Sequence, residues 1–575
     1  MSLFTLTLLL VILLLHLLLQ PTTSLTFQNL TYTLPSSSTP LLHNLSGSLP
    51  PSTLTTIIGP SGSGKTTLLN ALSSRLTTGT LTGTISSSPD IAYCEQTSSL
   101  SPFLTVSETV DFYIELLLPE ISKVERRRKR NDMLETFNLK GQCDTLIGND
   151  KIRGISGGEL KRLTILLSII LPKSYLFLDE PYSGLDSYSS SEIQILINKI
   201  VEGGTAVVVV THDLKDISGE IWCMSSGRIV YKGTSKNVSD YFSKKDVKGV
   251  TNFEEFMEEA TKGIEIDYDG EWNVRSDGVT TVSSDVGIFN RLKPRSGFLR
   301  QTRILLGRSF KEAWRSRGST IIKSITQVSI ALIYGTLYHI NNNQASIYDR
   351  FGLLSLVSIG TLNLSLAGTL RAFPKERVRV KKEQKERLFS VIPYFISKAI
   401  SSLPITASLS CLFGSIVYPL TGLNPSGFKS FLGLLTMHSI TSESLGLLIS
   451  SLSGSEDKAL AFFGPLTVLQ VIFDGRNLSY ENTPKVLRWL QGISLVRLNW
   501  QSLVINEFKG LKFNKDGRRG KVVIESGEEA VKVFGIEGGV GERVGKQIKF
   551  VGICWGMAIA TMLGGGGFIK IKGEF

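Results

Sequence analysis

The sequence Leu54-Thr55-Thr56-Ile57-Ile58-Gly59-Pro60-Ser61-Gly62-Ser63-Gly64-Lys65-Thr66-Thr67-Leu68-Leu69 decides the fold of the N-terminal half of the chain. Residues 59–66 match G-x-x-x-x-G-K-[ST], a loop whose backbone N–H groups surround phosphate oxygens. The apolar run at 54–58 predicts a strand, and the residues after Lys65 predict a helix, which is the context that the motif requires. We expect Lys65 to contact the β- and γ-phosphates and the Thr66 hydroxyl to bind Mg²⁺. A glycine- and serine-rich loop without a ligand is the weaker alternative.

Two further apolar runs end in side chains that suit a phosphate site. Residues 175–178 are typical of a strand buried on both faces, and Asp179 and Glu180 follow it, where open α/β sheets bind ligands. Asp179 suits a ligand of Mg²⁺, and Glu180 suits a general base for an attacking water. Taken alone, the pair is equally compatible with a solvated turn. Residues 206–210 form another such run, and His212 after it would sense the γ-phosphate, although a lone histidine there is usually structural.

Ser156-Gly157-Gly158-Glu159 opens a predicted helix. The S-x-x-E spacing is that of a capping box, which is the plain structural interpretation. Two glycines in a first turn cost roughly 1 kcal/mol each relative to alanine. Their presence suggests a ligand that approaches the backbone closely, and a helix N-terminus without side chains is a phosphate site.

Together these features resemble the nucleotide-binding domain of an ATP-binding cassette (ABC) transporter. The resemblance identifies residues 156–159 with the family's signature sequence and 183–186 (Ser183-Gly184-Leu185-Asp186) with its D-loop. It identifies Gln96 with the Q-loop glutamine, Tyr32 with the aromatic residue that stacks on adenine, and His212 with the switch histidine. It implies an α/β P-loop NTPase fold and ATP hydrolysis with ATP and Mg²⁺ as cofactors. The implied catalytic residues are Glu180, His212 and Gln96, and the implied metal contacts are Thr66, Gln96 and Asp179. The implied nucleotide contacts are Tyr32, Gly59, Pro60, Ser61, Gly62, Ser63, Gly64, Lys65, Thr66, Thr67, Gln96, Asp179, Ser156, Gly157, Gly158, Glu159 and Asp186.

The composition indicates that a membrane domain follows. Of the 575 residues 19% are charged, below the roughly 25% of soluble domains, and 42% are hydrophobic. This hydrophobicity excludes disorder as the main state and disfavours an entirely soluble chain. We divide the chain into an apolar N-terminal segment at 1–20, a nucleotide-binding domain at 21–250, a polar linker at 251–292 and an all-α membrane domain at 293–575. Segment 1–20 is compatible with a signal peptide, a signal anchor, an organelle-targeting element or a gene-model error.

The second half holds apolar stretches of about the length that spans a bilayer. They lie at 321–340, 351–370, 399–420, 428–452, 459–473 and 551–569, and a long outer loop is expected at 474–550. Five of the six are long enough. Hydropathy alone assigns 459–473 to a buried or re-entrant helix.

Loop charge predicts the orientation of these spans. The connections at 293–317 and 371–387 are rich in Lys and Arg. The connection at 341–350 has only one acidic and one basic residue, and that at 421–427 has no charged residue. This alternation follows the positive-inside rule and places the nucleotide-binding domain on the cytoplasmic side of a multi-pass membrane protein. The net charge of +12 therefore reports orientation, and we expect no nucleic-acid partner.

The second half resembles the G subfamily (White–Brown complex type) of ABC half-transporters. The matching segments are 373–377, 394–398, Leu403-Pro404, 421–425 and 505–508, and the nucleotide domain precedes the membrane domain, as in that subfamily. The resemblance implies six spanning helices, which makes 459–473 one of them, a connecting helix near 300–315 and a coupling region around 371–387. The sequence departs from the subfamily in the run at 1–20, in Leu160 after the signature and in the absence of cysteine from 474–550.

In the family that the chain resembles, the signature of one domain closes over ATP held by another, so one phosphate loop and one signature per chain imply a dimer, either a homodimer or a heterodimer with another half-transporter. By analogy with the subfamily, the expected function is ATP-driven export of a hydrophobic or amphipathic small molecule of the lipid, sterol or xenobiotic class, by alternating access in a membrane whose lipids surround the chain. The alternative is a non-transporting regulatory or partner subunit of a heterodimeric ABC complex. A soluble ATPase acting on ribosomes or DNA would need two cassettes and no spanning helices.

Overall fold

The computed structural model describes residues 24–34, 39–76, 78–86, 90–97, 99–211, 219–234, 279–281, 284–285, 294–478, 482–514 and 524–563. His212 and the apolar segment 1–20 lie outside these ranges. The chain forms two compact units, Met1–Lys293 and Pro294–Phe575.

A six-stranded sheet forms the centre of the first unit. Its strand order is β5 (Ile91–Cys94), β6 (Tyr175–Asp179), β7 (Ala206–Thr211), β3 (Leu54–Ile58), β8 (Glu220–Ser225) and β9 (Arg228–Thr234). All neighbours pair in parallel except β8 and β9. Every residue of β3, β6 and β7 is buried, as the continuous apolar runs predict for strands covered on both faces. Parallel pairing brings the carboxyl ends of these three strands to one edge.

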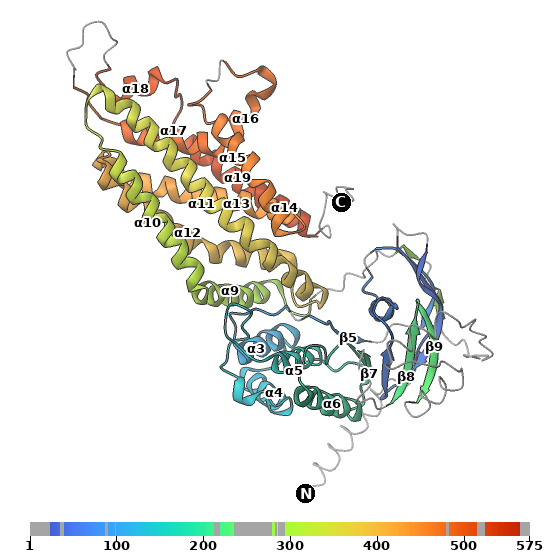
Figure 1. Cartoon of the computed structure of the whole chain (residues 1–575). Coiled ribbons are helices and arrows are strands. Elements are labelled where there is room, and N and C mark those ends of the chain that lie inside the picture. Colours follow the sequence, from blue (N-terminus) through green and yellow to red (C-terminus); the bar gives the residue numbers. More distant parts are fainter. Residues whose placement is uncertain are drawn as a thin grey trace, which may run out of the picture. The chain divides into compact units, whose positions relative to one another are not determined.

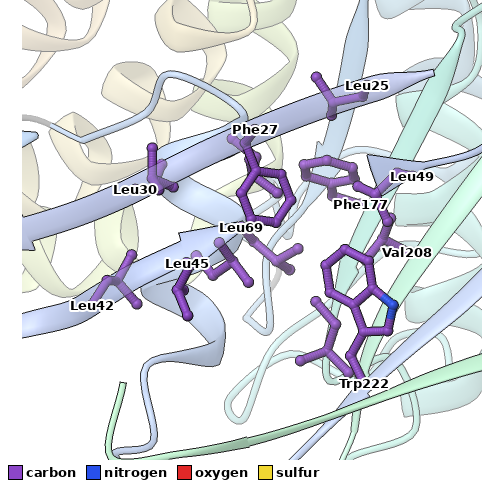
Figure 2. Packing of buried hydrophobic residues seen from close by; sticks show 14 of the residues in the cluster. Leu25, Phe27, Leu30, Leu42, Leu45, Leu49, Leu69, Phe177, Val208 and Trp222 are labelled. Carbon is purple, nitrogen blue, oxygen red and sulfur yellow. The ribbon is translucent and has the colours of Figure 1, made fainter. Parts of the chain in front are cut away.

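A second, antiparallel sheet packs on the first. It consists of β1 (Leu25–Thr33), β2 (Pro40–Leu49) and β4 (Thr80–Ser86), and the short strands β10 (Val279–Thr281) and β11 (Ser284–Asp285) pair with β4. Part of the expected linker 251–292 is therefore strand. Figure 2 shows the core between the sheets, in which Phe27 lies beside Trp222 with ring centroids 5.9 Å apart.

The helices of the first unit lie between its strands along the chain, and several of them gather together beside the parallel sheet (Figure 1). They are α2 (Lys65–Leu72), α3 (Val106–Leu117), α4 (Lys123–Thr136), α5 (Gly157–Ser168) and α6 (Ser187–Glu202), with a short 3₁₀ turn at Lys140–Gln142. Three of them begin with a capping box, in which a Ser or Thr hydroxyl accepts from the N3 backbone and a Glu at N3 accepts from the cap backbone. The caps are Thr105, Ser122 and Ser156.

The second unit is helical, as Figure 1 shows. Its helices are α9 (Phe298–Arg315), α10 (Arg317–Leu337), α11 (Gln344–Lys385), α12 (Val391–Thr421), α13 (Phe428–Leu452), α14 (Glu456–Ala461), α15 (Phe463–Ile472), α16 (Arg488–Ile493), α17 (Leu495–Phe508), α18 (Gly527–Val533) and α19 (Val540–Leu563), with 3₁₀ turns at Pro425–Gly427 and Lys485–Leu487. Within the described residues four segments are long and apolar enough to cross a membrane: Arg317–Leu337, Gln344–Lys385, Val391–Thr421 and Pro425–Leu452. They contain most or all of the first four predicted spans.

The remaining predicted boundaries differ from the structure. The span expected at 459–473 is broken at Phe462 into α14 and α15, and the last span belongs to α19, which begins earlier, at Val540. The basic connection 371–387 is mostly helix, because α11 continues to Lys385. A total of six spans stays a prediction.

The expected outer loop 474–550 contains a buried helix, α17, which packs against α11 and α13. Its polar residues lower its hydropathy, but they bond inside the unit. Asn499 donates to the Ser358 hydroxyl at 2.9 Å, and the Trp500 indole donates to the carbonyl of Phe351 at 3.1 Å. A buried helix whose polar side chains bond inside the unit thus resembles a polar loop in sequence.

The strongest of these internal contacts is an ion pair between α11 and α17. Arg350 and Glu507 are 2% and 1% exposed in their side chains, with Nη1 and Oε1 2.7 Å apart. The Asn424 backbone N–H donates to both Glu507 oxygens, and Arg350 also donates to Asn342. Such a pair is costly to break from one side, because the remaining charge stays buried without its partner.

We predict that Arg350→Met lowers the free energy of unfolding by about 3–5 kcal/mol, since it leaves the Glu507 carboxylate without its counter-ion. Adding Glu507→Gln should recover much of this loss. The exposed pair Lys546–Glu542 supplies the control, because Lys546→Met should cost under about 1 kcal/mol. Thermal unfolding of the full chain in lipid nanodiscs measures all three. Equal melting temperatures for Arg350→Met and Lys546→Met would contradict the prediction.

Candidate nucleotide-binding site

The phosphate loop links the end of β3 to the start of α2. A Cβ at Gly59 would lie 2.1 Å from the carbonyl oxygen of Met224, so no larger residue fits there. Gly62 and Gly64 have φ of +81° and +95°, in the left-handed region that glycine adopts without strain. Around Gly62 no described atom lies within 4 Å of the added Cβ, which leaves this side of the loop open. The loop therefore has the bends and the free space that a phosphate group requires.

Lys65 lies at the first position of α2 and is 5% exposed. Its ammonium group donates to the carbonyl oxygens of Gly59 and Pro60, each at 2.8 Å. The buried ammonium is therefore held over its own loop. Its contact with the β- and γ-phosphates stays a prediction.

Thr66 and Asp179 meet across 113 residues of sequence. The Thr66 hydroxyl donates to Oδ1 of Asp179 at 3.2 Å, and the Tyr93 hydroxyl donates to Oδ2 at 3.2 Å. Burial raises the pKa of Asp179, while the hydrogen bonds from Thr66 and Tyr93 oppose that rise. Burial and the neighbouring Asp179 also raise the pKa of Tyr93, so its hydroxyl stays protonated and acts as a donor. A hydroxyl and a carboxylate oxygen at this spacing are hard donors that fit Mg²⁺.

Glu180 follows β6 with a φ of +47°, which is unusual for a residue with a side chain. Its N–H donates to the carbonyl of Val210 at 2.9 Å, which holds this backbone conformation. Non-glycine residues in the left-handed region cost about 1–3 kcal/mol and cluster at active sites. The Glu180 carboxylate accepts from the Gln96 side-chain amide. The structure thus brings two of the predicted catalytic residues into direct contact.

Lys161 of α5 contacts the Q-loop, the segment that contains Gln96. Its ammonium donates to the carbonyl oxygen of Gln96 at 2.7 Å, although its side chain is nearly buried. The Q-loop is therefore bonded on two sides, by Glu180 through the Gln96 side chain and by Lys161 through the Gln96 backbone. The metal contact predicted for Gln96 stays a prediction.

Ser156 and Gly157 are exposed at the start of α5, and Ser156 forms a capping box with Glu159. A Cβ at Gly157 would meet only the Leu185 side chain, at an ordinary 3.5 Å. A Cβ at Gly158 would lie 2.6 Å from the Ser189 hydroxyl of α6. Close packing of α5 on α6 thus explains the second glycine without any ligand. Only the first glycine leaves backbone open to an approaching group.

The remaining predicted contacts occupy varied positions. Tyr32 is 3% exposed in the core, and its hydroxyl donates to the carbonyl of Thr78 at 2.5 Å, so its ring has little free surface for adenine here. Asp186 is exposed at the N-terminus of α6. Ser61 is exposed, Ser63 is buried and Thr67 is half-buried. Their roles in binding stay predictions, as does that of His212.

Motif matching missed two of these contacts, from Tyr93 and from Lys161. Tyr93 precedes Gln96 by three residues at the end of a short buried strand, and Lys161 lies one helical turn after Gly157. Their partners are distant in sequence. The order of the strands brings Tyr93 to Asp179, and the packing of α5 brings Lys161 to the Q-loop.

Known proteins match both units. Residues 42–183 match the ABC transporter family, and residues 300–508 match the ABC-2 type transporter family. The chain is 33% identical to ABC transporter G family member 7 of Arabidopsis thaliana over 86% of its own length and 74% of that protein. It is 25% identical to G family member 8 of Dictyostelium discoideum, over 86% of the chain and 83% of that protein. It is 28% identical to G family member 21 of Arabidopsis thaliana, over 81% of the chain and 77% of that protein. The phosphate loop, the acidic strand end and the helical second unit therefore belong to an ATP-hydrolysing, multi-pass membrane transporter, a half-transporter of the ABC G family.

Proposed function

We propose that two such chains, identical or different, form an exporter of hydrophobic or amphipathic molecules that is driven by ATP and Mg²⁺. The observation that carries the dimer is the open N-terminus of α5. Ser156 and Gly157 are exposed, whereas the phosphate loop lies at the start of a different helix, α2. An exposed helix N-terminus attracts anions through its free N–H groups. The signature of one chain would therefore bind the ATP held by the phosphate loop of the other.

In this proposal the chain's own side chains position and activate the hydrolytic water. Thr66 and Asp179 would hold Mg²⁺, which neutralises charge on the phosphates. Glu180 would accept a proton from the water as its oxygen bonds to the γ-phosphorus, and the bond to the β-phosphate oxygen breaks to release ADP. The Gln96 amide orients the Glu180 carboxylate.

ATP binding would close the two nucleotide domains together and so favour an outward-open membrane domain, because ATP has higher affinity for the closed pair. Hydrolysis would reset the cycle. Basic residues in the connections 293–317 and 371–387 support a cytoplasmic position for the nucleotide domain. The lipid, sterol or xenobiotic class of substrate rests on the family resemblance.

We predict that Glu180→Gln retains ATP binding and reduces hydrolysis at least about 100-fold, within the range that general-base catalysis supplies. The amide keeps the size of the side chain and loses its capacity to accept the proton. Glu202→Gln, at an exposed site on α6, is the control and should hydrolyse ATP at the parental rate. Phosphate release and nucleotide binding by the purified chain in nanodiscs measure both. Parental turnover by Glu180→Gln would exclude this base.

A second prediction tests whether each ATP site is composite, with the phosphate loop from one chain and the signature from the other, or is formed by a single chain. Lys65→Met should weaken ATP binding, whereas Lys199→Met on the exposed face of α6 should not. Gly157→Asp fits the space at that position and should block a partner's phosphates by charge repulsion. Each variant alone should be inactive as a homodimer. A pair of one Lys65→Met chain and one Gly157→Asp chain regains one intact site if sites are composite.

The pair is isolated through two different affinity tags and assayed for nucleotide trapping and hydrolysis. Up to half of the parental activity is expected. A pair as inactive as its parents would show that each chain completes its own site, and unchanged ATP affinity in Lys65→Met would overturn the phosphate-loop assignment.

A third prediction concerns transport. Reconstituted in liposomes, the chain should hydrolyse ATP faster when its substrate is added from a panel of lipids, sterols and xenobiotics. The Glu180→Gln variant should show no stimulation, which controls for contaminating ATPases. If Glu180→Gln in this chain leaves both basal and stimulated hydrolysis unchanged in a pair with a second half-transporter, the result would instead support a regulatory subunit.

A further inference from the structure

We propose that Tyr93 is a positioning residue of the metal site: its hydroxyl fixes one oxygen of the Asp179 carboxylate so that the other faces Thr66. The inference rests on the proposed Mg²⁺ site and extends it to a residue that does not touch the metal. Asp179 carries two separate contacts, Tyr93 on Oδ2 and Thr66 on Oδ1, each at 3.2 Å. These two contacts together define the orientation of the carboxylate.

The geometry assigns different tasks to the two hydroxyls. Thr66 is an exposed residue at the start of α2, next to the phosphate loop, which is the side from which a metal ion would approach. Tyr93 is 4% exposed, and its hydroxyl reaches Asp179 from the neighbouring strand β5. A metal would thus bind on the Thr66 side, while Tyr93 supports the carboxylate from within the protein.

The Tyr93 ring is itself held in place. The Arg75 guanidinium lies over the ring, 4.5 Å from its centroid, and pairs with Glu95 at 3.5 Å. A cation over an aromatic face within about 6 Å is attractive. Because the ring is fixed by packing and by this cation, its hydroxyl can hold the carboxylate with little freedom.

The competing explanation is that Tyr93 has a purely structural role as a core residue. Tyr175 is an example of a tyrosine with such a role. Tyr175 begins β6, the strand that ends in Asp179, and it is fully buried. Its hydroxyl donates to the carbonyl of Leu49 and accepts from the N–H of Leu25, both at 2.9 Å, so it joins the two sheets. The Tyr93 hydroxyl instead bonds to the carboxylate predicted to bind the metal.

Residues that hydrogen-bond to metal ligands commonly contribute to metal binding. Their loss typically weakens metal affinity about 10–100-fold. Tyr93→Phe removes only the hydroxyl and keeps the ring under Arg75. We expect the Mn²⁺ affinity of the ATP-bound chain to fall about tenfold, at the lower end of that range. ATP affinity in EDTA should stay parental, since no phosphate contact changes.

The experiment uses the full chain in nanodiscs, with Mn²⁺ binding followed by electron paramagnetic resonance and ATP binding measured in EDTA. Tyr175→Phe is the matched control and should keep parental Mn²⁺ affinity. Hydrolysis by Tyr93→Phe should need more Mg²⁺ and approach the parental maximal rate at saturating Mg²⁺, which a merely damaged core would not allow.

Mn²⁺ affinity within twofold of the parental value in Tyr93→Phe, or equal losses in Tyr93→Phe and Tyr175→Phe, would overturn the positioning role. So would a loss of ATP affinity in EDTA. Asp179→Asn tests the underlying site separately: if it leaves Mn²⁺ affinity unchanged, the proposed metal site fails, whatever Tyr93 does.

Discussion

Parallel pairing of β6 with β7 and of β7 with β3 is the constraint on which the nucleotide site depends. It aligns Asp179 with Val210 and Ile58 with Thr211, so the residues after three strands emerge at one edge. Successive side chains in a strand point to opposite faces, so a slip by one residue would turn Asp179 away from Thr66. Continuous burial of these strands makes such a slip costly.

The sequence predicted the parts of this site that depend on local pattern. Residues 54–58 form β3 as expected, because a buried parallel strand needs an unbroken apolar run, and Gly64-Lys65 begins α2. It could not reveal the Tyr93 and Lys161 contacts, which depend on strand order and helix packing. It did not reveal a packing reason for Gly158, beside which the Ser189 side chain of α6 fills the space, and the ligand contact expected of this glycine stays a prediction.

In the second unit the same limit has a different cause. Hydropathy measures the cost of moving polar groups out of water. It does not include the hydrogen bonds that these groups make inside the protein and that offset this cost. Asn499 and Glu507 make α17 look like a loop, although both are buried and hydrogen-bonded. Four long apolar helices were evident from sequence, while α17 and the division between α14 and α15 depend on tertiary packing.

The length of α11 has a mechanical consequence. Its 42 residues extend about 63 Å at 1.5 Å per residue, about twice the thickness of a hydrocarbon core. A rod of that length amplifies rotation: a tilt of about 5° at one end displaces the other by about 5 Å, at the same rise per residue. Pro374 interrupts the hydrogen-bond ladder toward the basic end. The helix thus combines a long lever arm with one point of weaker bending stiffness.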